Sequence, residues 1–348
     1  EWFGRTVIYS DHRYTYEDAQ EVIETKEGKF VEEILLMDKL AKIMRAKRIE
    51  EGAITFDRVE VKFQLDEKKN PTGVYFKQAK DANKLIEEYM LLANRKVAAF
   101  IGKAADGTPS NKPFVYRIHD DPDPEKINNF STFVNQFGHQ MNLQSPKEIA
   151  NSMNRVLADV SGKREENMVE LLAIRTMSKA KYTIENIGHY GLGFDYYSHF
   201  TSPIRRWPDV MVHRLLQRYL DGEKVTEKEA IEEQCKHSSA MEKLSTDAER
   251  SSIKYMQVKY LMGKVGQEFM GSVSGVTDFG MFIELKESLC EGLVSMRDLK
   301  DDHYELHKET FSLVGKRTKK HFQLGDALKV RVRNVDLVKK QIDFQLVK

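Results

Sequence analysis

The chain has 348 residues, of which 41% are hydrophobic and 31% are charged, and its formal net charge is +1. This length predicts two domains, and no apolar run reaches the ~18 residues that a membrane-spanning helix needs. The charge balance excludes a uniformly basic surface but leaves room for a local basic channel. Only Cys235 and Cys290 are present, so no disulfide framework is implied and a reducing, cytoplasmic setting is expected.

The first third of the chain is predicted to mix strands and helices. Residues 5–20 have the pattern of a strand, a turn and then a helix that starts near Tyr16. Apolar residues at helical spacing predict a helix over Val31–Ile49 and a longer one over about Asp81–Lys103. The alternation of apolar and polar residues in Gly52–Leu65 predicts strands. The inner face predicted for the longer helix consists of Ile86, Met90, Ala93, Val97 and Phe100.

The middle of the chain is predicted to be mainly helical. The segment Arg117–Phe130 ends a strand and begins a helix, because Pro122 and Pro124 fix the backbone at the entry. Further helices follow, and then a strand and a turn that glycines punctuate. Two more helices are predicted, over about Pro208–Leu220 and Glu227–Met262.

The pattern changes character after Gly263. Short stretches with a period of two, separated by glycine turns, predict a small barrel. We therefore expect a mixed α+β domain over residues 1–263 and an all-β barrel over residues 264–348. In one barrel strand, alternation predicts an inner set and an outer set, namely Leu328, Val330 and Val332 against Lys329, Arg331 and Arg333.

The barrel segment contains the motifs GSVSGVTDFGMFIEL and QLGDALKVRVRNVD, and over Gly266–Val347 it resembles the S1-type RNA-binding domain, an oligonucleotide-binding (OB) fold. Phe279 and Phe282 lie on either side of a glycine turn, where aromatic rings can stack on unpaired bases. Lys319 and Lys320 belong to a basic run that can follow a phosphate backbone. The alternative is that the two rings fill the barrel and that the lysines only face solvent.

A second resemblance covers the larger domain. The stretch YSHFTSPIRRWPDVMVHR (Tyr197–Arg214) closely resembles the signature of the ribonuclease II and ribonuclease R family, whose catalytic domain is called RNB. Trp207 replaces the tyrosine that is usual in this family. Three further blocks fit the same family in the same order, namely SDHRYTYEDAQ (Ser10–Gln20), KLIEEYMLLANRKVAAF (Lys84–Phe100) and CKHSSAMEKLSTDAER (Cys235–Arg250).

The resemblance implies roles for individual residues. It places Arg205 at the scissile phosphate, where a guanidinium can grip oxygens bidentately without losing its charge, and it makes Glu249 a second active-site group. Tyr16 and either Glu87 or Glu88 resemble positions that contact the 3′-terminal nucleotides and their 2′-hydroxyls, which distinguish RNA from DNA. Phe56 resembles the ring that stacks on the innermost bases.

Several of these residues have a simpler interpretation. Arg206 is a candidate second phosphate contact, but either Arg205 or Arg206 can instead form a plain salt bridge with Asp209 or another carboxylate. Glu249 would be read as a solvated glutamate from its helix alone, and only the motif suggests more. His199 and His213 are expected to brace the motif rather than to take part in chemistry.

The metal site of the family is a cluster of aspartates that lies upstream of the block RYTY. This chain begins just before that block and contains no matching cluster, so we expect Mg²⁺ to be the cofactor of a full-length protein, with no metal ligand in this chain. The run HDDPDPE (His119–Glu125) is interpreted as a proline turn that enters a helix. Cys235 and His237 are too few for a tetrahedral zinc site.

The resemblance therefore implies a magnesium-dependent 3′–5′ exoribonuclease that degrades single-stranded RNA processively to nucleoside 5′-monophosphates. Because the chain starts at Glu1 inside a recognisable domain, we expect it to be a fragment with little or no cleavage activity alone. Single-stranded RNA is the expected partner, and the ribosome or the RNA-decay machinery are further candidates. One alternative is a non-catalytic RNA-binding or scaffolding protein with a degenerate RNB domain. A hydrolase built on Ser202 is another, although the sequence lacks the G-x-S-x-G elbow.

Overall fold

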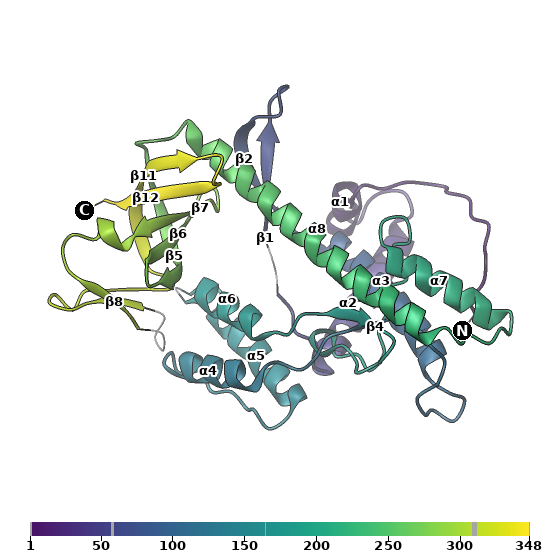
Figure 1. Ribbon diagram of the computed structural model, residues 1–348. Coiled ribbons are helices and arrows are strands. Elements are labelled where there is room, and N and C mark those ends of the chain that lie inside the picture. Colours follow the sequence, from purple (N-terminus) through teal and green to yellow (C-terminus); the bar gives the residue numbers. More distant parts are fainter. Residues whose placement is uncertain (1, 57–58, 164, 308–311, 348) are drawn as a thin grey trace.

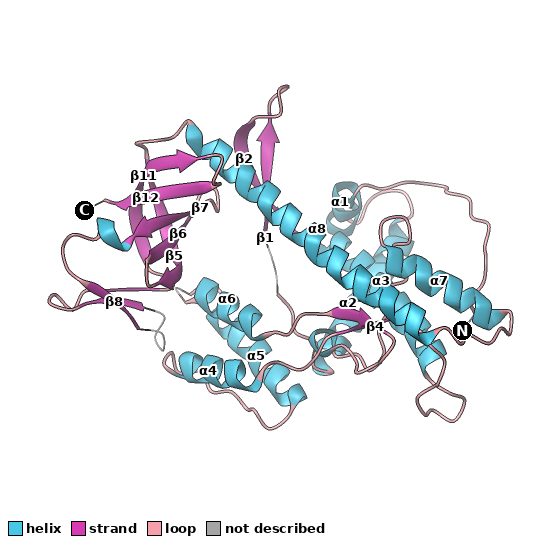
Figure 2. Ribbon diagram, in the orientation of Figure 1, coloured by secondary structure: helices cyan, strands magenta, loops and turns pink. Residues whose placement is uncertain are grey.

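A computed structural model describes residues 2–56, 59–163, 165–307 and 312–347. A mixed helical and stranded region is followed by a strand-rich region, as the sequence predicts (Figures 1 and 2). The helices are α1 (Tyr16–Thr25), α2 (Val31–Glu50), α3 (Asp81–Gly102), α4 (Pro124–Asn135), α5 (Pro146–Val160), α6 (Glu166–Thr176), α7 (Trp207–Leu220) and α8 (Lys228–Met262). The strands outside the barrel region are β1 (Val59–Leu65), β2 (Pro71–Gln78), β3 (Tyr116–Ile118) and β4 (Lys181–Thr183). In the part of the chain that the structure describes, no helix is long and apolar enough to cross a lipid bilayer.

The predicted helix starts are confirmed by their caps. At α4 the side chain of Asp123 accepts hydrogen bonds from the amides of Glu125 (2.9 Å) and Lys126 (3.3 Å), and Pro124 is the first helical residue. At α1 the hydroxyl of Thr15 accepts a hydrogen bond from the amide of Asp18. These side chains satisfy amides that a helix cannot pair internally, which is why the helices begin at these residues.

Two predictions for the first third of the chain are wrong. Residues 2–10 are extended but form no strand, because no described strand pairs with them, and Val7, Ile8 and Tyr9 are each more than 85% exposed. A strand needs a neighbour to pair its backbone amides and carbonyls. The stretch predicted as strands from Gly52 is a loop up to Phe56, and a strand begins only at Val59. Residues 57 and 58 lie outside the described part.

The predicted inner face of α3 is only partly right, since Val97 is buried but other members of that face are not. Ile86 and Phe100 are 40% and 43% exposed, and the buried side chains lie on a neighbouring face of the helix. That face includes Glu88 and Asn94, which are 3% and 2% exposed. The apolar pattern misplaced the face because two of its core positions are polar, and a hydrophobic spacing rule does not count them.

The longest helix, α8, connects the two parts of the molecule (Figure 1). Near its start it packs on the two-stranded ladder of β3 and β4, where Ser239 accepts a hydrogen bond from the amide of Tyr182 (2.9 Å). At its end, Val258 and Leu261 are fully buried in a hydrophobic cluster that also contains barrel residues. The antiparallel hairpin of β1 and β2 lies along the same helix, with the ring of Phe63 6.3 Å from that of Tyr260.

The C-terminal region is a closed barrel with the strand order β11-β12-β7-β6-β5. Its strands are β5 (Glu268–Thr277), β6 (Gly280–Leu285), β7 (Glu291–Ser295), β11 (Ala327–Asp336) and β12 (Gln341–Leu346). The predicted alternation is confirmed, since Val330 and Val332 are fully buried while Lys329 and Arg331 are exposed. A three-stranded sheet of β8 (Tyr304–His307), β9 (Ser312–Gly315) and β10 (His321–Gln323) is inserted before β11 and carries much of the basic run.

Candidate active site and nucleic-acid interface

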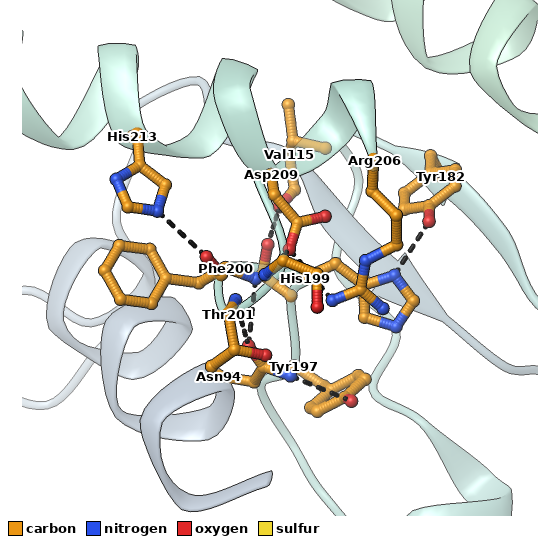
Figure 3. Close-up of polar contacts among 12 residues, drawn as sticks. Asn94, Val115, Tyr182, Tyr197, His199, Phe200, Thr201, Arg206, Asp209 and His213 are labelled. Atoms are coloured by element: carbon orange, nitrogen blue, oxygen red, sulfur yellow. Dashed lines mark hydrogen bonds and ion pairs between the residues drawn. The ribbon is translucent and has the colours of Figure 1, made fainter. Parts of the chain in front are cut away.

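The loop that precedes α7 is held by its backbone (Figure 3). The amides of Phe200 and Thr201 both donate to Oδ1 of Asn94, at 2.9 and 3.2 Å. The next amide, that of Ser202, donates to Oδ1 of Asp209 at 2.7 Å. Three consecutive amides are therefore paired with two side chains that come from two different helices, α3 and α7.

Beyond these amides the chain makes a tight turn. The amides of Arg205 and Arg206 both donate to the carbonyl of Ser202, at 3.2 and 3.0 Å. Pro203 begins the turn, Ile204 is fully exposed at its tip, and the side chain of Arg205 is exposed. Arg205 forms no ion pair with any residue that the structure describes. Its guanidinium is therefore available to an anion from outside.

Arg206 lies differently. Its Nη2 forms an ion pair with Oδ1 of Asp209 at 2.8 Å, and Asp209 is fully buried. Of the two interpretations that the sequence left open, the structure has the salt bridge. The prediction that Arg206 binds RNA is thus not supported, because its side chain is turned inward by a buried carboxylate (Figure 3).

Histidines and aromatic rings brace the loop. Nε2 of His213 donates to the carbonyl of Phe200 at 2.9 Å, and the two rings stack with their centroids 4.1 Å apart. Nδ1 of His199 lies 2.7 Å from the hydroxyl of Tyr182. Burial, helped by the nearby charge of Arg206, lowers the pKa of His199 to about 2, and burial raises the pKa of Tyr182 to about 12. The neutral imidazole therefore accepts a hydrogen bond from the Tyr182 hydroxyl, a structural role rather than general acid–base chemistry.

Glu249 lies on an exposed face of α8. The carboxylates of Glu60 and, more weakly, Glu249 raise the pKa of the Lys62 ammonium, which places Glu249 near the β1–β2 hairpin. Glu249 and Arg205 do not form an ion pair in the described structure. The two residues predicted to be catalytic are thus both exposed to solvent, on separate elements.

The two adjacent glutamates of α3 differ in burial. Glu87 is exposed, whereas Glu88 is buried and forms a close ion pair with Arg48 of α2, whose side chain is 5% exposed. A direct RNA contact by Glu88 is not supported, because its carboxylate is already engaged inside the protein. Of this pair, Glu87 is the residue that remains open to a ligand.

Tyr16, the first residue of α1, is 44% exposed and lines an open groove of about 630 Å³. Tyr75 and Phe76 of β2 line the same groove and are 47% and 46% exposed. The sequence patterns did not single out these two rings, although two adjacent aromatic residues in the short polar strand PTGVYFKQ could have indicated them. Phe56, by contrast, is partly buried and packs against the main hydrophobic cluster.

In the barrel, Phe279 is 54% exposed, and Phe282 is partly buried and packs edge-to-face against it with centroids 6.1 Å apart. Lys319 is exposed. Lys320 is exposed as well, but it pairs with Asp301 at 3.3 Å and lies over the ring of Phe322. Phe279 and Lys319 are therefore the predicted RNA contacts that are least engaged within the barrel.

A catalytic Mg²⁺ would need oxygen ligands, typically carboxylates, that converge on one point. No group of three or more histidine, cysteine, aspartate or glutamate side chains within the described ranges is placed to bind a metal ion. The aspartates of the His119–Glu125 run do not converge, since Asp123 caps α4. The residues that the structure describes therefore do not fit a catalytic magnesium site.

Comparison with known protein families identifies two domains in the chain. The model of the RNB domain matches residues 1–222. The chain belongs to the RNB family. The model of the S1 RNA binding domain matches residues 263–346, so this RNB chain continues into an S1 domain.

Several curated relatives of this RNB chain carry the name ribonuclease R. Ribonuclease R of Aquifex aeolicus is 38% identical over 98% of this chain and 49% of its own length, and ribonuclease R 1 of Lactococcus lactis is 33% identical over 98% and 42%. A solved structure of Mycoplasma genitalium RNase R in complex with ribose methylated single-stranded RNA superimposes with a TM-score of 0.86 at 25% identity, covering 96% of this chain and 53% of that one. The chain thus spans about half the length of the curated relatives that it matches.

Proposed function

We propose that this chain forms the RNA-gripping part of a hydrolytic 3′–5′ exoribonuclease that acts on single-stranded RNA. The single observation that carries the proposal is the exposed, uncompensated guanidinium of Arg205, presented by a loop with a firmly held backbone. Its support from relatives is the family name ribonuclease R and the single-stranded RNA in the M. genitalium complex.

Each exposed site residue takes a definite role in this proposal. Arg205 clamps the non-bridging oxygens of the scissile phosphate, where negative charge grows during hydrolysis. Glu249 serves as the second active-site group. Tyr16 and Glu87 meet the sugar and base of the 3′-terminal nucleotides, and Glu87 can accept a hydrogen bond from a 2′-hydroxyl. We assign to the reaction processive action and nucleoside 5′-monophosphate products.

The S1 barrel supplies a second grip on the same strand. Phe279 stacks on unpaired bases and Lys319 approaches the backbone, contacts that tolerate any sequence. RNB membership is consistent with a divalent-metal-dependent hydrolase, and Mg²⁺ is our proposed cofactor. The described residues provide no ligand set for it, so the roles proposed here are only those of the chain's own side chains.

The test uses end-labelled single-stranded RNA and DNA of one sequence in the presence of Mg²⁺. The chain is assayed alone and joined to the upstream half of A. aeolicus ribonuclease R, with full-length A. aeolicus ribonuclease R as the positive control. Arg205→Ala is compared with Arg175→Ala, a matched loss of an exposed arginine on α6.

We expect the joined protein to shorten RNA, but not DNA, from the 3′ end. Arg205→Ala should abolish the shortening and Arg175→Ala should preserve it. The chain alone should cleave weakly or not at all, because no metal-ligand cluster was found in its sequence. The same end-labelled RNA assay measures this. If the joined protein binds RNA and never shortens it, the non-catalytic RNA-binding alternative replaces this proposal.

A further inference from the structure

We propose that Asn94 and Asp209 are positioning residues that fix the direction of Arg205, and that Arg206 belongs to this brace rather than to the RNA-binding surface. The inference rests on the function proposed for Arg205. It concerns residues that the sequence analysis did not assign, or assigned otherwise.

Asn94 holds the beginning of the loop. It is 2% exposed, and its Oδ1 accepts hydrogen bonds from the amides of both Phe200 and Thr201. Its Nδ2 donates to the hydroxyl of Tyr197 at 3.2 Å. An asparagine is rarely so buried unless all its groups are paired, and here its partners all lie in the segment that leads to Arg205.

Asp209 holds the two sides of the turn itself. One buried oxygen, Oδ1, accepts from the amide of Ser202 at 2.7 Å and from the guanidinium of Arg206 at 2.8 Å. Ser202 is the residue whose carbonyl closes the turn, and Arg206 is the residue directly after Arg205. The chain is therefore tied on both sides of Arg205, through the amide of Ser202 and the side chain of Arg206, while Arg205 itself is exposed.

The brace also separates the charges of two adjacent arginines. The carboxylate of Asp209 compensates the charge of Arg206 inside the protein. The charge of Arg205 has no such partner among the described residues. A phosphate that reaches this loop thus meets one free guanidinium, carried by a held backbone, rather than two that compete.

Fixed placement matters because a clamp works only when it is held in its productive geometry. A displacement of about 1 Å at a reacting centre can cost ~100-fold in rate, and a functional side chain needs support from the residues behind it. Asn94 and Asp209 provide this support from α3 and α7, two helices that are far apart in the sequence.

The test is a double-mutant cycle on the affinity for single-stranded RNA, measured with this chain by fluorescence anisotropy without added metal. The variants are Asn94→Ala, Arg205→Ala and the double variant. We expect each single change to weaken binding ~10-fold, the lower range for a hydrogen bond to a charged group. If Asn94 acts through Arg205, the double variant binds no more weakly than Arg205→Ala.

Two further variants separate positioning from simple loss of structure. Asn94→Asp keeps an oxygen for both amides and should bind within ~3-fold of the unmodified chain. Ser152→Ala removes another buried side chain that accepts a backbone amide, that of Asn142, and should leave RNA binding unchanged. Circular dichroism and melting temperatures confirm folding, and Asn94→Ser carries the same cycle if Asn94→Ala does not fold.

The outcomes distinguish the two proposals. If the fold-changes of Asn94→Ala and Arg205→Ala multiply in the double variant, Asn94 does not act through Arg205 and the positioning role is overturned. If Arg205→Ala leaves RNA affinity unchanged, the proposed function of Arg205 fails first, and the positioning role that depends on it fails too.

Discussion

The stability of the barrel is expected to fall as pH rises through neutrality, because of a pair of glutamates at its junction with α8. Glu284 of β6 and Glu291 of β7 are directly opposite each other across the two strands. Burial first, and then the neighbouring charge of Glu291, raise the pKa of Glu284 from 4.5 to about 7. Two like charges in such a pair destabilise a sheet, so Glu284 remains protonated until neutral pH.

The sign and size follow from the two pKa values. Since the folded-state pKa lies above the ordinary value of 4.5, the folded protein holds this proton more tightly than the unfolded chain. The contribution is fully present below pH ~4.5 and is lost as pH rises through about 7. At ~1.4 kcal/mol per pKa unit, the free energy of unfolding loses about 3 kcal/mol across this window.

The change to make is Glu284→Gln, which keeps the shape and removes the titration. We expect this variant to match the unmodified chain at pH 4.5 and to exceed it by about 3 kcal/mol at pH 8. Both tryptophans, Trp2 and Trp207, lie outside the barrel, so tryptophan fluorescence does not report directly on its unfolding. Hydrogen–deuterium exchange of barrel peptides in a urea series measures the barrel stability instead. Glu287→Gln, an exposed glutamate in the next turn, is the matched control.

Other titrating groups face this pair and have to be considered. Lys254 of α8 donates to the carbonyl of Glu291 at 2.6 Å, and burial lowers its pKa. Burial raises the pKa of Cys290 to about 11, so it stays neutral over the window. Both groups are retained in Glu284→Gln and therefore cancel in the difference. A stability gap between the two proteins that stays constant from pH 4.5 to 8 would refute the reasoning.

Three more predictions concern the RNA surface and the core. Phe279→Ala should weaken binding of single-stranded RNA by about 1–3 kcal/mol, the value of one stacked base, and should not lower the melting temperature. An unchanged affinity in anisotropy measurements would show that Phe279 does not contact the RNA. Arg205→Ala should reduce the magnitude of the slope of log binding constant against log salt concentration by about 0.7, the value for one phosphate contact on a single strand. A slope equal to that of the unmodified chain would contradict a phosphate contact by Arg205. Glu88→Ala should lower the free energy of unfolding, measured by urea denaturation, by about 3–5 kcal/mol because it leaves Arg48 buried and unpaired. Glu87→Ala should change it by less than about 0.5 kcal/mol. Equal losses in the two variants would contradict the assignment of Glu88 as the buried and Glu87 as the exposed glutamate.

The sequence predicted best where local rules decide. The start of α4 followed from proline and aspartate chemistry at its first turn, and the barrel strands followed from alternation, with Val330 and Val332 fully buried. It failed where distant partners decide. The extended segment around Val7 has strand composition but no neighbouring strand in the described structure, and composition cannot supply one.

The same limit applies to the candidate site. The resemblance singled out Arg205 and Glu249, and both are exposed as a ligand contact requires. It did not separate Arg205 from Arg206, because the difference is a buried carboxylate that the turn brings next to one of them. It did not separate Glu87 from Glu88 either, since Arg48 is 40 residues away in the chain. Neighbouring charged residues differ in role only once their partners in space are known.

The position of α8 links the two halves of the proposed function. Its first half is bound to the ladder beside the arginine loop, where Glu242 pairs with Arg117 and the ring of Tyr182 lies under the same guanidinium. Its last turns are buried in the barrel cluster, and Gln257 donates to the carbonyl of Leu289 at 2.8 Å. Glu249 lies between these two attachments, on a stretch of the helix that stays exposed. One continuous helix spans both attachments. Under the proposed function, RNA bound by the barrel and RNA bound at Arg205 would therefore contact parts of the protein that this single helix joins, and the same helix carries Glu249.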